Sequence, residues 1–500
     1  MGPVGGGDAA GRAGSVVAAA DPGALLHDPI AERASTVAAL GEALAAATRY
    51  LSAVDSLPAR DPAADATALG FGGSLPEAGA GSLAAIRRLA DAGPVAATHS
   101  AGPRFFHFVT GGSTPAALAA DWLTSTFDNN AGMWVSSPLA AQLEKLSLAW
   151  LKELFNLPPE WGGVLVTGAT MANFTALAAA RQWWGEQRGL DLARDGMGGT
   201  PALPVFAGGY IHASAIKALG MLGTGYGAVR RLTADPAGRV DLSGLERELG
   251  ALGGAPSIVM ATAGEVNAGG FDPIDAMAEL AHAHNAWLHV DGAFGLYARI
   301  SPRLAPLTAG IELADSVIAD GHKWLNVPYE SGFAFVREER LLHSVFGIGA
   351  PYFPEEVAGR PDYLMLGPEM SRRARCLAIW ATLAAYGRQG YREMVERHVA
   401  LAHRLAGQVR AADDFELLAE PLINVVCFRH RPPGLAEEEL DDHNRRLGQA
   451  VIGDGRVYFG TTVYRGKVAF RPAISNWRTV ASDVDTILPV CRELASRSAR

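Results

Sequence analysis

Asp291 and Lys323 lie 32 residues apart, and each follows a short apolar run that predicts a β-strand. Asp291 stands in the segment LHVDGAFG (288–295) and Lys323 in the segment ADGHKWLN (319–326). In open α/β sheets the carboxyl ends of strands face the ligand crevice, so both side chains are expected at one sheet edge. A carboxylate there can pair with a protonated heterocyclic nitrogen, and a neutral lysine amine can form a Schiff base with an aldehyde. Singly, each residue is more often a turn residue or a solvated charge; together they favour a cofactor site.

These two segments, with the further segments below, resemble the fold-type I pyridoxal 5′-phosphate enzymes. Within them the sequence is similar to the group II amino acid decarboxylases, which include glutamate and aromatic amino acid decarboxylases. The run His-Lys-Trp at 322–324 is typical of that group, and the resemblance extends from Pro103 to Arg478. It implies that Lys323 forms the Schiff base with the cofactor, that Asp291 keeps the pyridine nitrogen protonated, and that His322 belongs to the same cofactor site.

The resemblance identifies the segment VTGATMAN (166–173) as the phosphate cup of the family. A strand, a turn at Gly168 and then a helix would bring backbone N–H groups to a phosphate, with Ala169 and Thr170 as donors. Read without the resemblance, the segment is an ordinary strand–helix turn in which Thr170 is the N-cap.

The two faces of the cofactor ring are assigned in the same way. In YIHASAIK (210–217), His212 corresponds to the histidine that stacks on the ring, and an imidazole there can also exchange protons near neutral pH. Considered by itself, His212 is more often a helix-capping or partly buried histidine. Ala293, two residues after Asp291, is small enough to cover the opposite face.

The segment 260–274 resembles the family's connection between the middle strand and the next helix, and its Thr262 corresponds to a threonine near the cofactor. Many relatives carry two threonines where this chain has Glu265 and Val266. The added carboxylate either alters the charge of the site or is a solvated loop residue. Asp320 is a second departure, because animal members of the family typically carry Asn there.

Decarboxylation itself is implied by the resemblance. The cofactor is the electron sink, and the protein selects the bond to be broken by its orientation. In DYLMLGPEMSRRAR (362–375), Tyr363 corresponds to the catalytic tyrosine proposed to protonate the carbanion, and relatives with Phe there oxidise amines instead. Tyr352, in GAPYFP (349–354), is the alternative, since loop alignment is loose. Either tyrosine could instead simply pack the loop.

Four residues are assigned to the substrate. Phe105, His107 and Trp134 lie in segments that resemble the family's N-terminal substrate cleft, although aromatic clusters are most often core. Arg471 matches a C-terminal arginine that can bind the substrate α-carboxylate as a bidentate partner. Otherwise Arg471 is a surface charge at a strand end.

Hydrophobic periodicity predicts the elements that position these residues. From about residue 101, short apolar runs alternate with Ala-rich amphipathic stretches, which indicates a mostly parallel sheet with crossover helices. The predicted strands are 164–167, 203–207, 229–232, 257–262, 287–290, 316–319 and 332–336, and the helices include 171–187, 213–221 and 273–284. These form a large α/β domain over 101–370.

A smaller C-terminal α+β domain is predicted over 371–500. Its predicted helices are 371–386, 390–413, 437–451 and 481–496, and its strands lie near 424–429, 457–464 and 467–471. Residues 1–100 are expected to be an N-terminal tail, loose to about residue 24, followed by helical segments broken by Pro and Gly.

Composition excludes several classes of protein. The 500 residues include 43 Lys and Arg against 52 Asp and Glu, a formal charge of −9, which disfavours binding to nucleic acid through phosphates. No run of about 18 apolar residues predicts a transmembrane helix, and no signal peptide is read at the N-terminus. The three cysteines, Cys376, Cys427 and Cys491, favour buried free thiols in a reducing cytosol over disulfides or zinc ligands.

The sequence therefore predicts a cytoplasmic fold-type I carboxy-lyase that uses pyridoxal phosphate, acts on an aromatic or bulky apolar L-amino acid and releases an amine. The resemblance implies a homodimer with the active site between subunits; no metal, nucleic-acid or membrane partner is expected. The alternatives are decarboxylation of glutamate or another acidic amino acid, a carbon–carbon lyase or aminotransferase on the same fold, and a non-catalytic scaffold.

Overall fold

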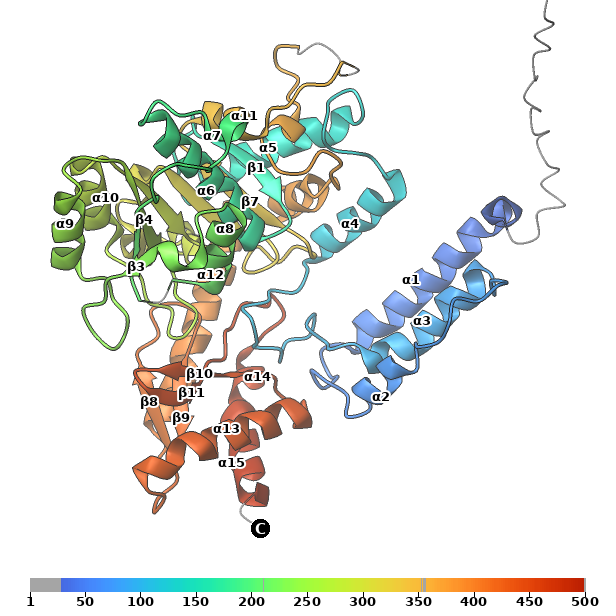
Figure 1. Cartoon of the computed structure of the whole chain (residues 1–500). Coiled ribbons are helices and arrows are strands. Elements are labelled where there is room, and N and C mark those ends of the chain that lie inside the picture. The colour runs from blue at the N-terminus through green and yellow to red at the C-terminus, as the bar shows by residue number, and fades with distance from the viewer. Residues whose placement is uncertain (1–27, 210, 352, 354–356, 499–500) are drawn as a thin grey trace, which may run out of the picture. The chain divides into compact units, whose positions relative to one another are not determined.

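The computed structural model describes residues 28–209, 211–351, 353 and 357–498, which fall into two compact units (Figure 1). Unit 1 contains the described residues up to 53 together with 63–97. Its elements are the 3₁₀ helix η2 (Pro29–Ser35) and the helices α1 (Thr36–Ala53), α2 (Ala64–Leu69) and α3 (Ser82–Ala96). Glu32 accepts a hydrogen bond from the backbone N–H of Ser82 at 2.9 Å, which ties η2 to the start of α3. The tail predicted to be loose, residues 1–24, lies outside the described residues.

Unit 2, residues 54–62 and 98 onward, is built around a seven-stranded sheet. Its strands are β1 (Gly162–Val166), β2 (Val205–Ala207), β3 (Val229–Arg231), β4 (Ser257–Thr262), β5 (Ala286–Asp291), β6 (Ser316–Asp320) and β7 (Gly332–Val336). They lie in the order β1-β7-β6-β5-β4-β2-β3. β7 is antiparallel to β1 and β6, whereas the pairs from β6 to β3 are parallel. The prediction of a mostly parallel α/β sheet is confirmed.

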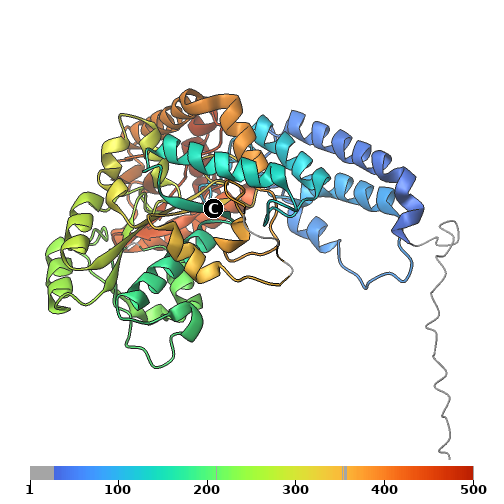
Figure 2. The ribbon, with the colours of Figure 1, turned by 90° about the horizontal axis from the view of Figure 1, so that it is seen from above.

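Helices flank this sheet, as Figures 1 and 2 show. α6 (Ala169–Glu186) packs against β5, β6 and β7, while α10 (Ile274–Ala283) packs against β4 and β5. α8 (Ala213–Met221) packs on α6 and has the bounds that the sequence predicts. Because β1, β5, β6 and β7 are buried along their whole length, they read in the sequence as continuous apolar runs. The remaining elements of this region are α7 (Leu192–Asp195), α9 (Leu242–Ala251), α11 (Glu339–Phe346), η3 (Tyr226–Ala228), η4 (Gly295–Ile300), η5 (Ala305–Thr308), η6 (Ile311–Leu313) and η7 (Tyr363–Met365).

Two long helices, α4 (Pro115–Phe127) and α5 (Pro138–Phe155), are absent from the sequence-based prediction. Each begins at a proline that follows a capping hydroxyl. The hydroxyl of Thr114 accepts the backbone N–H of Ala117 at 3.3 Å, and that of Ser137 accepts the N–H of Ala140 at 3.3 Å. Proline at the first helical position after a Ser or Thr N-cap is a helix-start pattern, so the sequence did contain the signal.

The C-terminal part of unit 2 contains a four-stranded antiparallel sheet in the order β10-β11-β9-β8. The elements are α12 (Cys376–Arg410), β8 (Phe415–Ala419), β9 (Cys427–His430), α13 (Glu437–Asp454), β10 (Thr461–Tyr464), β11 (Lys467–Phe470), α14 (Ala481–Asp485) and α15 (Ile487–Ser498). The sequence predicts two helices where α12 runs, and Gly387, with a φ of 58°, interrupts the helical backbone between them. Strand β8 is not predicted by the sequence.

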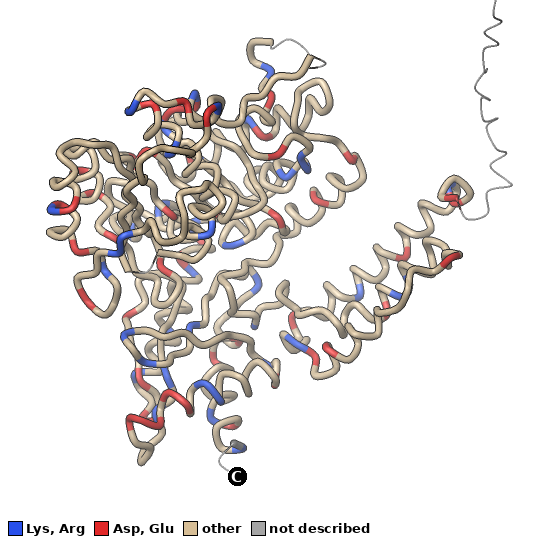
Figure 3. Tube along the Cα trace, in the orientation of Figure 1, with Lys and Arg blue, Asp and Glu red and all other residues tan. Residues whose placement is uncertain are grey.

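Charged residues of both signs are interspersed along the described chain, as Figure 3 shows. Cys376, Cys427 and Cys491 are buried free thiols. Among the described residues, no helix is both long enough and apolar enough to cross a membrane.

Candidate active site

A cavity of about 620 Å³ opens at the carboxyl ends of β4, β5 and β6. It is lined by the last residues of these strands, by the start of α6, by His212 before α8, and by loop residues from both ends of unit 2. All the residues predicted to bind the cofactor line it, together with Arg471: Ala169, Thr170, His212, Thr262, Asp291, Ala293, His322 and Lys323. The structure thus brings the cofactor residues predicted from separate segments into one cavity.

Lys323 follows β6 by three residues, and its amine is held at the wall of the cavity. The Lys323 Nζ lies 3.3 Å from Oδ2 of Asp320 and 5.7 Å from the centre of the Phe294 ring. His322 Nε2 lies 3.4 Å from the same Asp320 oxygen. The backbone behind them is tightly packed, because a Cβ on Gly111 would overlap the carbonyl oxygen of Lys323.

The start of α6 carries a feature that the sequence did not predict. The N–H of Ala169, the first residue of α6, donates to Oδ1 of Asp320 at 2.6 Å. A carboxylate is favourable at this end of a helix because of the helix dipole. Ala169 therefore meets a carboxylate of the protein itself, while Thr170 lines the cavity beside it.

Asp291 ends β5 and is only 6% exposed. Its Oδ1 accepts the backbone N–H of Ala293 at 3.1 Å, and its Oδ2 accepts Nδ2 of Asn173 at 3.1 Å. Two hydrogen bonds fix the carboxylate and leave lone pairs for a further donor in the cavity. The position suits a partner for a protonated ring nitrogen.

His212 is the N-cap of α8, and its ring opens into the cavity. Its Nδ1 lies 2.6 Å from the hydroxyl of Ser214. Desolvation lowers the pKa of His212, although the nearby carboxylate of Asp291 acts in the opposite direction. The imidazole is therefore neutral at neutral pH. His212 both caps α8 and lines the cavity, so the two roles expected from the sequence are compatible.

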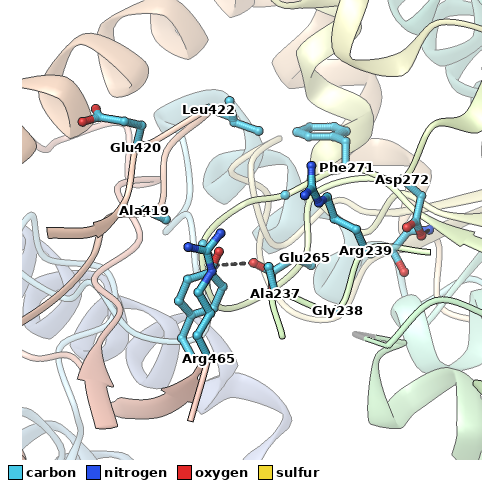
Figure 4. Close-up of a pocket in the computed structure, with 14 residues that line it drawn as sticks. Ala237, Gly238, Arg239, Glu265, Phe271, Asp272, Ala419, Glu420, Leu422 and Arg465 are labelled. Carbon is cyan, nitrogen blue, oxygen red and sulfur yellow. Dashed lines mark hydrogen bonds between the residues drawn. The ribbon is translucent and has the colours of Figure 1, made fainter. Parts of the chain in front are cut away.

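Glu265 lies in the wall between this cavity and a smaller one of about 250 Å³. Figure 4 shows Glu265 in the smaller cavity together with Arg239 and Arg465. Its two carboxylate oxygens accept the backbone N–H groups of Asn267 at 2.7 Å and Ala268 at 2.5 Å, and burial raises the pKa of Glu265. The residue is 7% exposed. The expectation of a solvated loop residue is therefore wrong: Glu265 holds its own loop from within the protein.

Of the four predicted substrate residues, the structure brings Arg471 alone to the lining of the cavity. Arg471 donates weakly to the carbonyl of Val266, at 3.4 Å. Phe105 is buried and stacks on Tyr458 with ring centres 5.1 Å apart. Trp134 is tied to the loop before η7, because its backbone N–H donates to Asp362 at 2.7 Å. Desolvation, helped by the charge of Arg471, lowers the pKa of His107 to about 4, so this ring is neutral at neutral pH.

The catalytic tyrosine predicted from the sequence does not line the cavity of Lys323. Tyr363 is buried beside Arg372, whose guanidinium lies 5.8 Å from the centre of its ring, and it lines a different pocket with Lys145 and Lys152. Burial raises the pKa of Tyr363. The alternative, Tyr352, lies outside the described residues.

The sequence analysis did not assign several residues that the structure brings to the site, among them Phe294 beside Lys323. Phe108 and Tyr329 line the cavity with 61% of each residue exposed, and Asn173 binds Asp291 from α6. Tyr329 stacks on His322 with ring centres 4.2 Å apart, and its hydroxyl bonds to that of Thr110 at 3.1 Å. A polar Asn173 within the Ala-rich helical segment was the one available signal.

Comparison with known proteins agrees with this geometry. The pyridoxal-dependent decarboxylase conserved domain matches residues 94–431. The aromatic-L-amino-acid decarboxylase of Bacillus atrophaeus is 29% identical over 80% of this chain and 82% of its own length. The L-2,4-diaminobutyrate decarboxylase of Rhizobium meliloti is 32% identical over 85% of both chains. The structure of Oryza sativa TDC with PLP and tryptamine superposes with a TM-score of 0.86 at 26% identity, covering 94% of this chain and 99% of that one.

Proposed function

The chain belongs to the pyridoxal-dependent decarboxylase family, and from this premise we propose that it decarboxylates an L-amino acid with an aromatic or bulky apolar side chain. As a member of this family, the protein is a lyase that uses pyridoxal phosphate as its cofactor. Its relatives act on substrates as different as aromatic amino acids and diaminobutyrate. We therefore infer the side chain of the substrate and the roles of individual residues from the cavity of this protein.

The residues of the cavity fit pyridoxal phosphate by their chemistry. A lysine amine, a buried carboxylate, a neutral imidazole and a helix start line one space of about 620 Å³, a volume within the usual range for cofactor pockets. Gly168 keeps the helix start open, because a Cβ there would lie 3.0 Å from the ring of His322. Lys323 would hold the aldehyde carbon, Asp291 the ring nitrogen, and Thr170 the phosphate.

When bound, the cofactor withdraws electrons from the α-carbon of an attached amino acid, which makes loss of carbon dioxide possible. Asp291, buried and doubly hydrogen-bonded, would keep a proton on the ring nitrogen. His212 would cover one ring face and Ala293 the other. Arg471 would orient the substrate by its α-carboxylate.

One residue must return a proton to the α-carbon. Among the described residues His212 lines the cavity and is the group we propose, whereas Tyr363 would have to leave its buried place beside Arg372. Tyr352 is the alternative donor, as in the sequence analysis.

The aromatic lining of the cavity carries the proposal for the substrate. Phe108 and Tyr329 expose 61% each, and Phe294 lies on the same wall as Lys323. Exposed aromatic faces of this kind lower their free energy by contacting an apolar or aromatic side chain. These three residues take over the role that the sequence analysis gave to Phe105 and Trp134.

A homodimer is part of the proposal. Helix α4 exposes the apolar side chains of Trp122, Leu123 and Phe127, at 41%, 50% and 48%, and such a patch favours association. Sedimentation of the holoenzyme tests this, and a monomer with full activity would contradict it.

The experiment is to incubate the purified holoenzyme with each of the twenty L-amino acids and to measure amines by mass spectrometry and carbon dioxide release. Amine and carbon dioxide from aromatic or bulky apolar amino acids are expected. A keto acid without carbon dioxide would support an aminotransferase instead. Amine only from glutamate, aspartate or diaminobutyrate would refute the proposed side-chain preference and retain the reaction.

A further inference from the structure

Asn173 on α6 is a branch point between the two residues proposed to contact the cofactor ring. Its side-chain Nδ2 donates to Oδ2 of Asp291 at 3.1 Å and to the hydroxyl of Ser214 at 3.4 Å. The Ser214 hydroxyl lies 2.6 Å from Nδ1 of His212. One buried amide therefore reaches Asp291 directly and His212 through a single hydroxyl.

Behind Asn173, three further buried side chains continue the hydrogen-bonded chain away from the cavity. Asn173 Oδ1 lies 2.8 Å from Nε2 of His289, and His289 Nδ1 lies 2.8 Å from the hydroxyl of Ser316. Trp287 closes the chain by donating its indole N–H to Ser316 at 2.9 Å. Trp287 is 2% exposed, and Asn173, His289 and Ser316 are fully buried. The hydrogen-bonded chain is therefore shielded from water.

The chemistry of its two ends fixes the direction of every hydrogen bond. The indole of Trp287 can only donate, so Ser316 accepts from it. Asn173 Oδ1 can only accept, so it takes the proton on Nε2 of the neutral His289, and Nδ1 of His289 accepts the proton of Ser316. The ionised carboxylate of Asp291 can only accept, so the Asn173 amide must present Nδ2 to it, which is the same orientation.

The branch toward the second site residue is directed in the same way. The Ser214 hydroxyl accepts from Asn173 and can donate its own proton to Nδ1 of His212. The backbone N–H of Ser214 also donates to this nitrogen, at 3.2 Å. A neutral His212 then carries its proton on Nε2.

We propose that Asn173, held in place by His289, is a positioning residue that orients Asp291 for the cofactor's ring nitrogen and fixes the tautomer of His212. This inference rests on the proposed function, since it requires pyridoxal phosphate in the cavity. Burial lowers the pKa of His289 to about 4, so the ring stays neutral through the working pH range. The alternative is that the chain only stabilises the fold.

The test compares two ligands for the apoenzyme: pyridoxal phosphate, and an analogue with carbon in place of the ring nitrogen. Wild-type protein should bind pyridoxal phosphate more tightly, because the analogue offers nothing to Asp291. Asn173→Leu should reduce this preference about tenfold or more, the size expected for a lost hydrogen bond to a charged group. Binding is read from ligand absorbance and protein fluorescence, without any measurement of turnover.

Two milder variants test the same inference if Asn173→Leu does not fold. His289→Gln and Ser316→Ala remove outer members of the chain, and each should reduce the preference by a smaller factor, severalfold. His398→Phe is the matched control, because His398 is an equally buried histidine that binds Trp324 and the carbonyl of Asn476 instead. It should lower the thermal midpoint and leave the ligand preference unchanged.

The measured affinities distinguish failure of the inference from failure of the proposed function. The inference is overturned if the Asn173, His289 and Ser316 variants bind both ligands equally more weakly than the wild type. It is also overturned if none of these variants binds either ligand more weakly. In both cases the proposed function still stands. A wild-type protein that binds neither ligand overturns the proposed function, and the inference with it.

Discussion

Asp320 pairs with Lys323 across 3.3 Å, and its other oxygen accepts the N–H of Ala169 at the start of α6. The carboxylate therefore occupies the helix start that was predicted to receive a phosphate. The negative charge of Asp320 interacts favourably with the dipole of α6 at this end of the helix. A phosphate brought to the same place would be repelled by it, so cofactor affinity should depend on the charge at position 320.

Replacing Asp320 by Asn should tighten the binding of pyridoxal phosphate. The amide oxygen can still accept the N–H of Ala169, while the negative charge that opposes the phosphate is gone. An effect of roughly fivefold is expected, the size of one screened charge–charge interaction. Titration of the apoenzyme at low and at moderate salt measures it, and the gain should shrink as salt is added.

Asp315→Asn is the matched control for this variant. Asp315 precedes β6 at the opposite end from Asp320, where it accepts the N–H of Leu288 at 2.8 Å and pairs with Arg337. The same change in charge there should leave cofactor affinity unaltered. Weaker binding in Asp320→Asn would mean that the carboxylate supports the site through Lys323 more than it repels the phosphate.

Lys323→Ala should abolish the visible absorbance of the bound cofactor and reduce turnover by several orders of magnitude, because no other lysine lines the described part of the cavity. Spectra of the purified protein and the rate of carbon dioxide release measure the two effects. Lys217→Ala, which changes an exposed lysine on α8, should leave both unchanged. Retention of the visible band in Lys323→Ala would refute the assignment of Lys323.

The surroundings of Tyr363, the tyrosine assigned from the sequence as the acid, predict a small effect of its substitution. Tyr363 is buried against Arg372 and away from Lys323, so Tyr363→Phe should keep amine production within about threefold while removing one buried hydroxyl. Tyr352→Phe is the paired variant. Loss of amine with oxygen uptake in Tyr363→Phe would restore the original assignment, and the same result in Tyr352→Phe would move the acid there.

The residues whose place in the cavity could be predicted from the sequence are those that follow a strand end. Asp291 and Lys323 each follow a buried strand, and parallel strands must end at one edge. No comparable rule exists for the aromatic residues. Phe108 faces the cavity from a loop in which both it and Val109 have positive φ values, 57° and 60°. Such values are rare for residues other than glycine, so no pattern in the sequence favoured Phe108 over Phe105.

Hydrogen bonds between residues on different strands and helices of the sheet could not be predicted from the sequence either. Asp320 binds Ala169 although the two residues are 151 positions apart, and that contact depends on β7 lying between β1 and β6. The strand order is a tertiary property. The sequence could identify Asp320 as a departure from relatives, but its effect on the phosphate site required the topology.

Acid should destabilise the protein between pH 6.5 and pH 4, through its buried histidines. Burial lowers the pKa of four histidines to between about 3 and 4: His107, His289, His398 and His430. An unfolded histidine titrates near 6.5, so between pH 6.5 and 4 the unfolded chain binds more protons than the native one. The free energy of unfolding therefore falls as the pH falls through this window.

Three carboxylates oppose this trend, because burial raises the pKa of Asp272, Glu265 and Asp483. Burial raises the pKa of Asp272 to about 6, so the native protein binds the extra proton there and gains stability as the pH falls below 6. The pKa is lowered for seven histidines, the four above together with His212, His322 and His443. They outweigh the three carboxylates, so the thermal midpoint of the holoenzyme should drop by about 5 °C or more between pH 7.5 and pH 5. His398→Phe should lower the midpoint at pH 7.5 but narrow the difference between the two pH values, because one buried histidine no longer takes up a proton on unfolding. A midpoint at pH 5 equal to or above that at pH 7.5 would mean that the histidines are protonated in the native state.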